Sequence, residues 1–478
     1  MSSITIVLMA LPFFLGFAIY LLPKLDRYLA LIGAIASLGY ALLVFIQPSP
    51  LTLQFLDNFG VTLTIDSLSG YFILTNALVT LAVLFYCWAS DKTAFFYAQI
   101  LMLHGSVNAT FICSDFISLY VALEVSGIAA FLLIAYPRND RSIWVALRYL
   151  FISNTAMLFY LVGAVLVYKA NHSFSFAGLE QVPPEAIALL FVGLLVKGGI
   201  FVSGLWLPLT HSESETPVSA LLSGAVVKAG VYPLVRCALM VEEVEPIVRI
   251  FGVATALLGV CYAVFEKDTK RVLASSTTSQ LGLILAAPEV GGFYALTHGL
   301  VKALLFLIAG NLPSRDLKEL QNQPLRTSIW ITLVVASFSI SGFPLLAGFG
   351  AKMLTLKNLV SWQVILMNIA IVGTATVYAK FIFLPHQKPE NSDRIKLGFW
   401  LAAILLLGGL IVANAVYVEA YTVVNITKAL VKIALGWLAY FFIIRRITLK
   451  LPRALENFDH LIGAMSLMSI LLFWMVLA

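Results

Sequence analysis

The chain has 478 residues, of which 61% are apolar and only 11% are charged, and its mean hydropathy is +0.96. A soluble globular chain carries roughly 25% charged residues, so this composition excludes that class and favours an all-α, polytopic transmembrane protein. We interpret the formal net charge of +6 as a signal of membrane orientation, not of nucleic-acid binding.

Apolar stretches long enough to cross roughly 30 Å of hydrocarbon as helices follow one another along the chain. They predict about 14–16 spans, and the full set of sixteen lies near 4–22, 28–46, 68–89, 95–113, 115–136, 143–168, 184–207, 217–240, 247–265, 273–288, 290–310, 328–356, 362–383, 396–416, 422–444 and 459–478. The first stretch has no basic leader and no small-residue cleavage site, so we expect a span there and not a signal peptide. Residues 51–66 alternate apolar and polar residues around Asn58-Phe59-Gly60, which predicts an extramembrane hairpin.

The Lys and Arg residues of the loops are distributed unevenly between the two sides. Eighteen lie on the side reached after the first span, and three (Lys169, Arg249 and Lys357) lie on the other. Because cytoplasmic loops carry the excess of basic residues, both termini are predicted on the non-cytoplasmic side. A bacterial-type cell membrane is the expected location, with the thylakoid membrane as the alternative.

The sequence contains no framework for a metal or a cofactor. Its four cysteines, Cys87, Cys113, Cys237 and Cys261, lie in or at the ends of apolar spans and form no CxxC pair, which is typical of small buried hydrophobic residues. Neither a GxGxxG nor a GxxxxGK[ST] loop is present. We therefore expect no metal, no cofactor and no catalytic residues.

Nine basic residues remain inside the predicted spans. For Arg148 and Lys380, near span ends, and for Lys428 and Lys432, in a less apolar segment, we expect a long stem to carry the charge to the interface. Arg236 is intermediate, four residues from its span end.

The other four basic residues lie deep in their spans, together with a histidine and a carboxylate. This set of six is Glu124, Lys197, Lys228, His298, Lys302 and Lys352. A charge at bilayer depth costs at least about 2.5–3.5 kcal/mol on insertion scales. Because folds are only marginally stable, such charges are retained only where water or a partner group compensates them, or where the function needs them. Since a desolvated lysine can release and regain a proton, the six residues predict a proton path.

Helix-breaking residues accompany two of these lysines. Gly198, Gly199 and Pro208 follow Lys197, and a span of 29 residues containing Pro344 and Gly348 leads to Lys352. Broken helices expose backbone dipoles at buried ion sites. The two interrupted spans are five apart in order, so their orientations are opposite, which indicates an inverted repeat.

Three segments carry a resemblance to a known family: WLPLTHSESETPVSALLSGAVVKAGVYPLVR (206–236), FEKDTKRVLASSTTSQLG (265–282) and HGLVKALLFLIAG (298–310). They resemble the antiporter-like membrane subunits shared by Mrp-type sodium/proton antiporters, whose D-type subunit is the most similar, and by complex I and related NDH complexes. The two acids of LTHSESE, Glu213 and Glu215, depart from the family pattern, and the last two spans lie outside the shared core.

The resemblance implies two inverted five-helix repeats, each with a broken helix. It implies the division 1–94 (N-terminal spans and hairpin), 95–240 (first half-channel), 247–383 (second half-channel) and 396–478 (C-terminal spans). It also implies roles: Glu124 and Lys197 as the pair of the first half-channel, Lys228 as the central lysine, His298 and Lys302 as the link, and Lys352 as the lysine of the second half.

The expected function is therefore an ion-translocating subunit of a multisubunit cation (sodium)/proton antiporter of Mrp type. The alternative is a proton-pumping subunit of a complex I, NDH-1 or related redox complex. A self-contained enzyme or a scaffold is disfavoured, because no catalytic motif is present and a scaffold has no use for buried lysines. Expected partners are other membrane subunits, protons, Na+ and the lipid bilayer, with no nucleic acid.

Overall fold

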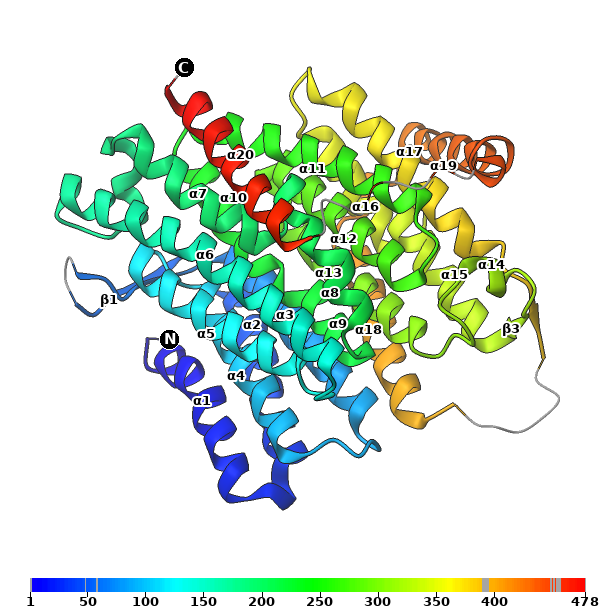
Figure 1. Cartoon of the computed structure of the whole chain (residues 1–478), viewed down its shortest axis with the longest axis horizontal. Helices are drawn as coiled ribbons and strands as arrows, with labels where there is room; N and C mark the ends of the chain where they lie inside the picture. Colours follow the sequence, from blue (N-terminus) through cyan, green and yellow to red (C-terminus); the bar gives the residue numbers. More distant parts are fainter. Residues whose placement is uncertain are drawn as a thin grey trace.

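The computed structural model describes residues 2–47, 49–56, 59–388, 395–447, 449, 452 and 457–477, and these form a bundle of helices (Figure 1). The helices of the first half are α1 (Ser2–Leu21), α2 (Asp26–Ile46), α3 (Ser67–Cys87), α4 (Ala94–Thr110), α5 (Phe116–Ile134), α6 (Asp140–Asn171), α7 (Pro184–Gly198), α8 (Leu207–Glu213), α9 (Thr216–Leu221) and α10 (Lys228–Met240). Those of the second half are α11 (Glu245–Phe265), α12 (Thr269–Ala286), α13 (Gly291–Ala309), α14 (Leu317–Leu320), α15 (Thr327–Ser341), α16 (Ala347–Lys357), α17 (Gln363–Ile382), α18 (Leu397–Val416), α19 (Val423–Phe442) and α20 (Phe458–Leu477).

Thirteen helical segments of the described chain are long and apolar enough to cross a membrane, which confirms a polytopic helical membrane protein. The remaining three of the sixteen predicted spans correspond to α4, which has 17 residues, to α12, which is rich in Ser and Thr, and to the pair α15 and α16. The sequence predicted one long span over 328–356, whereas the structure divides it into two shorter helices.

The strands are short and lie outside the long helices. The predicted hairpin is present as β1 (Leu51–Gln54) and β2 (Thr62–Ile65), an antiparallel pair in which Leu51 faces Ile65. Of the predicted turn, Asn58 lies outside the described residues, and Gly60 has a positive φ of 119°, a conformation that favours glycine. A second pair, β3 (Leu325–Arg326) and β4 (His386–Gln387), is parallel.

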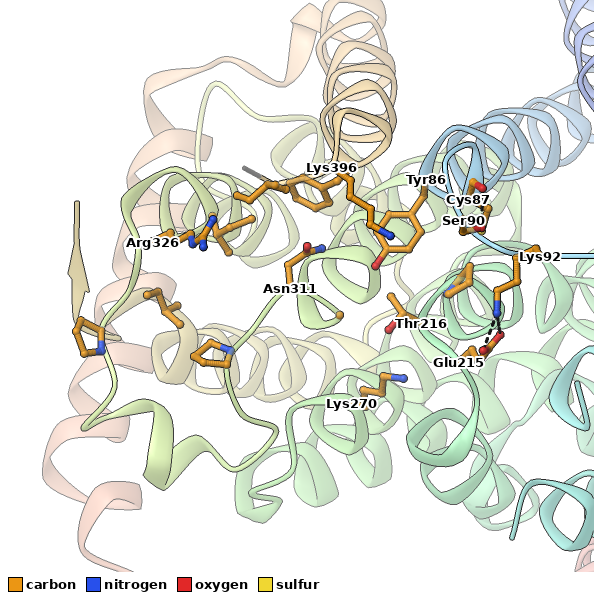
Figure 2. A pocket seen from close by; sticks show the side chains of 18 residues that line it. Tyr86, Cys87, Ser90, Lys92, Glu215, Thr216, Lys270, Asn311, Arg326 and Lys396 are labelled. Carbon is orange, nitrogen blue, oxygen red and sulfur yellow. Dashed lines mark hydrogen bonds and ion pairs between the residues drawn. The ribbon is translucent and has the colours of Figure 1, made fainter. Parts of the chain in front are cut away.

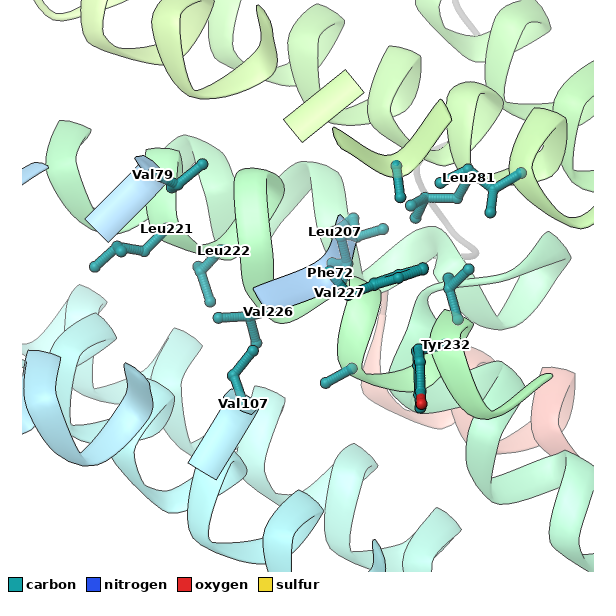
Figure 3. Close-up of a cluster of buried hydrophobic side chains, with 14 of the residues drawn as sticks. Phe72, Val79, Val107, Leu207, Leu221, Leu222, Val226, Val227, Tyr232 and Leu281 are labelled. Carbon is teal, nitrogen blue, oxygen red and sulfur yellow. The ribbon is translucent and has the colours of Figure 1, made fainter. Parts of the chain in front are cut away.

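The centre of the bundle consists of α3, the α9–α10 segment, α12 and α13. The most apolar windows of the α9–α10 segment and of α13 are completely buried, whereas less than a third of those of α1, α19 and α20 is buried. Figure 3 shows the packing near the middle, where Phe72 and Val79 of α3 and Val107 of α4 lie among side chains of the α9–α10 segment. Outside this centre, α19 packs beside α17, and α20 packs against α7 (Figure 1). An interior covered in this way can hold ionisable groups away from lipid.

Two helices are interrupted by the same backbone motif. At the end of α7, Gly199 has a φ of 68°, its amide donates to Val196 O, and the amide of Ile200 donates to Leu195 O. At the end of α15, Gly342 has a φ of 84° and the amides of Gly342 and Phe343 donate to Ser339 O and Phe338 O. This paired 5→2 and 6→1 pattern is the Schellman motif, in which glycine takes the left-handed conformation. It ends each helix inside the bundle.

Candidate functional site: a buried row of ionisable groups

The first two residues of the row, Glu124 on α5 and Lys197 on α7, lie side by side. Their closest atoms, Lys197 Nζ and Glu124 Oε1, are 3.8 Å apart, and Lys197 also donates a 2.6 Å hydrogen bond to Ser153 Oγ on α6. A Cβ at Gly127 would lie 2.7 Å from Lys197 Nζ, so this glycine leaves the space that the ammonium group occupies. The lysine thus has two polar partners, at a depth where lipid offers none.

Lys228 begins α10, and one residue, Val227, separates it from η5 (Leu222–Val226), a π-helical turn. Its side chain is completely buried, and Nζ donates a 3.0 Å hydrogen bond to the carbonyl of Ser223 in that turn. A π-bulge frees a carbonyl from the helix ladder, and here the freed carbonyl accepts from the lysine. No hydrogen bond between described residues joins Lys228 to Lys197; their helices meet where Gly198 and Gly230 touch backbone to backbone.

His298 and Lys302 lie one turn apart on α13, as predicted from their spacing. Lys302 Nζ donates to Leu273 O and to the hydroxyl of Tyr378, each at 2.9 Å, and this hydroxyl also lies 3.0 Å from Ser276 Oγ. Both ring nitrogens of His298 are buried and have no hydrogen-bond partner. Such a group is costly unless water reaches it.

A small cavity connects His298 with the last residue of the row. It has a volume of about 10 Å³ and is lined by His298, Lys352, Gln280 and Tyr294, among others. Lys352 Nζ is buried and, like the His298 nitrogens, has no hydrogen-bond partner. A cavity of roughly 10–15 Å³ holds one water molecule when polar groups surround it, so a single water could bridge the histidine and the lysine.

Both broken helices place a lysine at the carbonyl end of their first half. Lys197 lies in the last turn of α7. Lys352 lies on α16, but its side chain reaches back over the break, since a Cβ at Gly342 would meet Lys352 Cδ at 2.9 Å. The carbonyl end of a helix carries partial negative charge, which favours a cation there.

The residues predicted to break the helices have different roles. Gly199 takes the left-handed conformation, whereas Gly198 is helical and a Cβ on it would lie 3.3 Å from the backbone of Gly230. Pro208 lies in the first turn of α8, where a missing amide hydrogen is harmless. Pro344 lies between α15 and α16, and a Cβ at Gly348 would lie 1.7 Å from Ser339 O, so Gly348 permits close packing.

A large cavity opens among side chains that come from several helix ends and loops (Figure 2). It has a volume of about 910 Å³ and is lined by one acid, Glu215, and four basic residues, Lys92, Lys270, Arg326 and Lys396. Lys92 Nζ lies 2.7 Å from Glu215, and Lys270 Nζ donates to Ser214 O at 2.7 Å. All these residues belong to segments that the basic-residue count placed on the cytoplasmic side.

His211 is a candidate residue that sequence analysis missed. It lies on α8, its two ring nitrogens are buried without a hydrogen-bond partner, and its ring stacks on Phe306 at 4.9 Å, one turn after Lys302. The predicted span ended at residue 207, which left His211 in a loop; extending it through the Pro208 start signal would have placed the histidine in the bundle. The large cavity reaches Lys270 at the start of α12, and the Phe306 ring under His211 lies one turn from Lys302 on α13.

Two basic residues for which we expect a long stem to reach the interface, Lys380 and Arg148, are buried within the chain. Lys380 is 9% exposed and donates to Ala263 O and Glu266 O, which end α11. Arg148 is 4% exposed, with its guanidinium 5.9 Å from the ring of Trp144.

Arg236 forms a two-pronged ion pair with Asp66, the residue that caps α3. Burial alone would raise the pKa of Asp66, but the hydrogen bonds and the charge of Arg236 outweigh it and hold this pKa below its usual range. The pair therefore joins α3 to α10 beside the row.

The cysteines are unpaired in the structure. Cys87, Cys113 and Cys237 are buried, as expected, but Cys261 is exposed on α11, so the prediction of a buried residue is wrong there. Within the described residues, no group of His, Cys, Asp and Glu side chains has the arrangement of a metal site.

Membrane-length helices around an interior row of cations and one carboxylate define a polytopic membrane protein with an ionisable core. Residues 113–377, more than half of the chain, match the model of the NADH:quinone oxidoreductase/Mrp antiporter transmembrane family. The chain belongs to this family, which confirms the resemblance seen in the sequence.

Individual relatives agree with the family assignment. The chain is 26% identical over 456 residues, 85% of its length and 92% of the other's, to the D-type subunit of the Na(+)/H(+) antiporter of Alkalihalophilus pseudofirmus. In fold it is similar to a chain of the Mrp complex from Dietzia sp. DQ12-45-1b, with a TM-score of 0.74, 19% identity, and 96% and 100% of the two chains covered. It is also similar to a chain of the membrane-bound sulfane sulfur reductase, an archaeal respiratory membrane complex, with a TM-score of 0.77, 22% identity, and 91% and 99% covered.

Proposed function

We propose that the chain is an ion-translocating subunit of a multisubunit cation (sodium)/proton antiporter of Mrp type. The observation that carries the proposal is the set of buried ionisable groups Glu124, Lys197, Lys228, the α13 pair and Lys352, in a chain similar over most of its length to the D-type subunit of an antiporter. Protons are the transported species that lysine, histidine and carboxylate groups can pass from one to the next.

The row divides into two halves that correspond to the proposed half-channels, residues 95–240 and 247–383. In the first, the carboxylate of Glu124 favours the protonated form of Lys197, and moving it away favours release of the proton. In the second, His298 accepts and donates at its two nitrogens, and the small cavity leads on to Lys352. The central residues Lys228 and Lys302 connect the halves across α10 and α13.

The chain is a multi-pass protein, and we propose that it lies in a bacterial-type cell membrane with both termini on the non-cytoplasmic side. The eighteen-to-three distribution of basic loop residues supports this orientation. The 910 Å³ cavity then opens to the cytoplasm and supplies protons through the region of Lys270 and His211. Single cysteines placed near Ser2 and near Lys92 test this orientation. On intact cells, an impermeant thiol reagent should label the cysteine near Ser2 and should not label the cysteine near Lys92.

The second candidate is a proton-pumping subunit of a redox complex, favoured by the similarity in fold to the chain of a respiratory complex. The same row would serve, with a redox module as the driver. Vesicles containing the complete complex distinguish the two: an imposed sodium gradient should drive proton movement in the antiporter, whereas only an electron donor should do so in the redox pump. Replacing Lys228 with Met should abolish proton movement in either case, and normal movement would contradict the proposed path.

A further inference from the structure

A groove between α17 and α19 opens on the outer surface of the bundle, where α19 lies at the edge (Figure 1). It encloses about 850 Å³, and apolar side chains such as Ile369, Val424 and Val431 form most of its walls. Only 22% of the most apolar window of α19 is buried within the chain. The helix therefore offers a long unpaired face beside a hollow.

The groove also contains two lysines, Lys428 and Lys432, one turn apart on α19. No carboxylate of the described residues forms an ion pair with either, and like charges at this spacing repel. Lys432 is the tenth of the twenty residues of α19, about 15 Å along the helix from each end at 1.5 Å per residue. The sequence favoured stems that carry both charges to the interface; from the middle of the helix this reach is long, and a nearby counter-charge would lower the cost of the charge.

A third polar group faces the same groove from α17. The amide nitrogen of Asn368 donates to Val364 O at 2.7 Å, but its Oδ1 is buried and has no hydrogen-bond partner. Lipid acyl chains cannot satisfy the two ammonium groups. The groove thus matches a mostly apolar occupant that carries polar groups, of which at least one is negative.

The groove adjoins the end of the ionisable row. Phe349 and Met353 of α16 form a small hydrophobic cluster with Ala429 of α19, so the helix that carries Lys352 packs against the helix that carries Lys432. A charge placed beside Lys432 would therefore change the electrostatic environment of Lys352.

We propose that the groove receives a transmembrane helix of a partner subunit, and that this helix carries an Asp or Glu at the level of Lys432. The helix would cover the apolar walls, and its carboxylate would pair with the lysine and lower the cost of a charge at that depth. This inference rests on the proposed function in one respect, namely that the chain assembles with other membrane subunits.

Site-specific photocrosslinking in the co-expressed complex tests the proposal. A benzoylphenylalanine replaces Val431, which lines the groove and is 51% exposed, or in a control Leu430, which is 43% exposed at the same depth but does not line it. After illumination of native membranes, we expect the probe at position 431 to join a transmembrane peptide of another subunit with an Asp or Glu within one turn of the crosslinked residue. The probe at position 430 should give little or none of this product.

A second measurement tests the charge. With the probe at 431, Lys432→Met should reduce the crosslink at least several-fold, whereas Lys432→Arg should retain it, and a Lys432→Glu chain should recover it when the partner's acid is changed to Lys. Crosslinks only to lipid, to a second copy of this chain or to a helix without an acid would overturn the proposal, as would an unchanged yield with Lys432→Met. The crosslink does not depend on transport, so its failure is distinct from failure of the proposed function.

Discussion

Replacing Gly199 with Ala should strain the break in α7. The residue has a φ of 68°, and the left-handed conformation costs a residue with a Cβ roughly 1–2 kcal/mol. The new Cβ would also lie 2.4 Å from Leu207 Cδ1, and moving that side chain off its rotamer costs about 0.5–1.5 kcal/mol. The free energy of unfolding should fall by about 2 kcal/mol, and proton transport should fall because Lys197 lies in the last turn of α7.

The matched control is Gly39→Ala in α2. A Cβ added at Gly39 would meet no atom within 4 Å, and the residue has an ordinary helical φ, so alanine there should be neutral or stabilising by up to about 1 kcal/mol. Thermal unfolding and proton uptake by vesicles are measured for both variants. If Gly199→Ala unfolds and transports like Gly39→Ala, the Schellman break does not require glycine and this reasoning is wrong.

Three further predictions concern the charged pairs. Glu124→Ala and Lys197→Ala should each abolish exchange in vesicles while membrane insertion stays normal, and near wild-type exchange in both would disprove the pair. Lys302→Met should remove proton flux between the halves, which full flux with an unchanged pH profile would contradict. Because the pKa of Asp66 is lower in the folded protein, its pair with Arg236 stabilises the fold above about pH 4, near the unfolded value, and this stabilisation is lost as the pH falls through the folded value. Asp66→Asn should therefore remove that part of the acid dependence of thermal unfolding, and an unchanged acid profile would show that the pair contributes nothing.

The positions of the spans followed from the sequence, because the length of an apolar stretch and the thickness of a bilayer set them directly. The six residues of the row could likewise be named, since an ionisable group at span depth needs a reason. Their partners could not. The contacts of Lys302 with Tyr378 and of Lys197 with Ser153 join residues far apart in the chain.

Errors arose where tertiary contacts decide the outcome. The closeness of Lys380 to a span end predicted a stem that reaches the interface, but it could not predict that the carbonyls at the end of α11 accept from its ammonium group. Gly198 and Gly199 are identical in sequence terms; only the approach of Gly230 and the sign of φ separate a packing role from a breaking role. His211 was lost because the predicted span stopped one residue short of Pro208.

The packing of α20 against α7 and η4 (Phe201–Trp206) has a consequence for biogenesis. During translation, α7 and its break leave the ribosome long before α20 does, with α8 to α19 synthesised in between. Until α20 is inserted, the side of α7 that it covers faces lipid or the insertion machinery. A helix that is synthesised late therefore completes the packing of the half that is synthesised first. A chain truncated before α20 should be retained by the insertion machinery or degraded by membrane proteases.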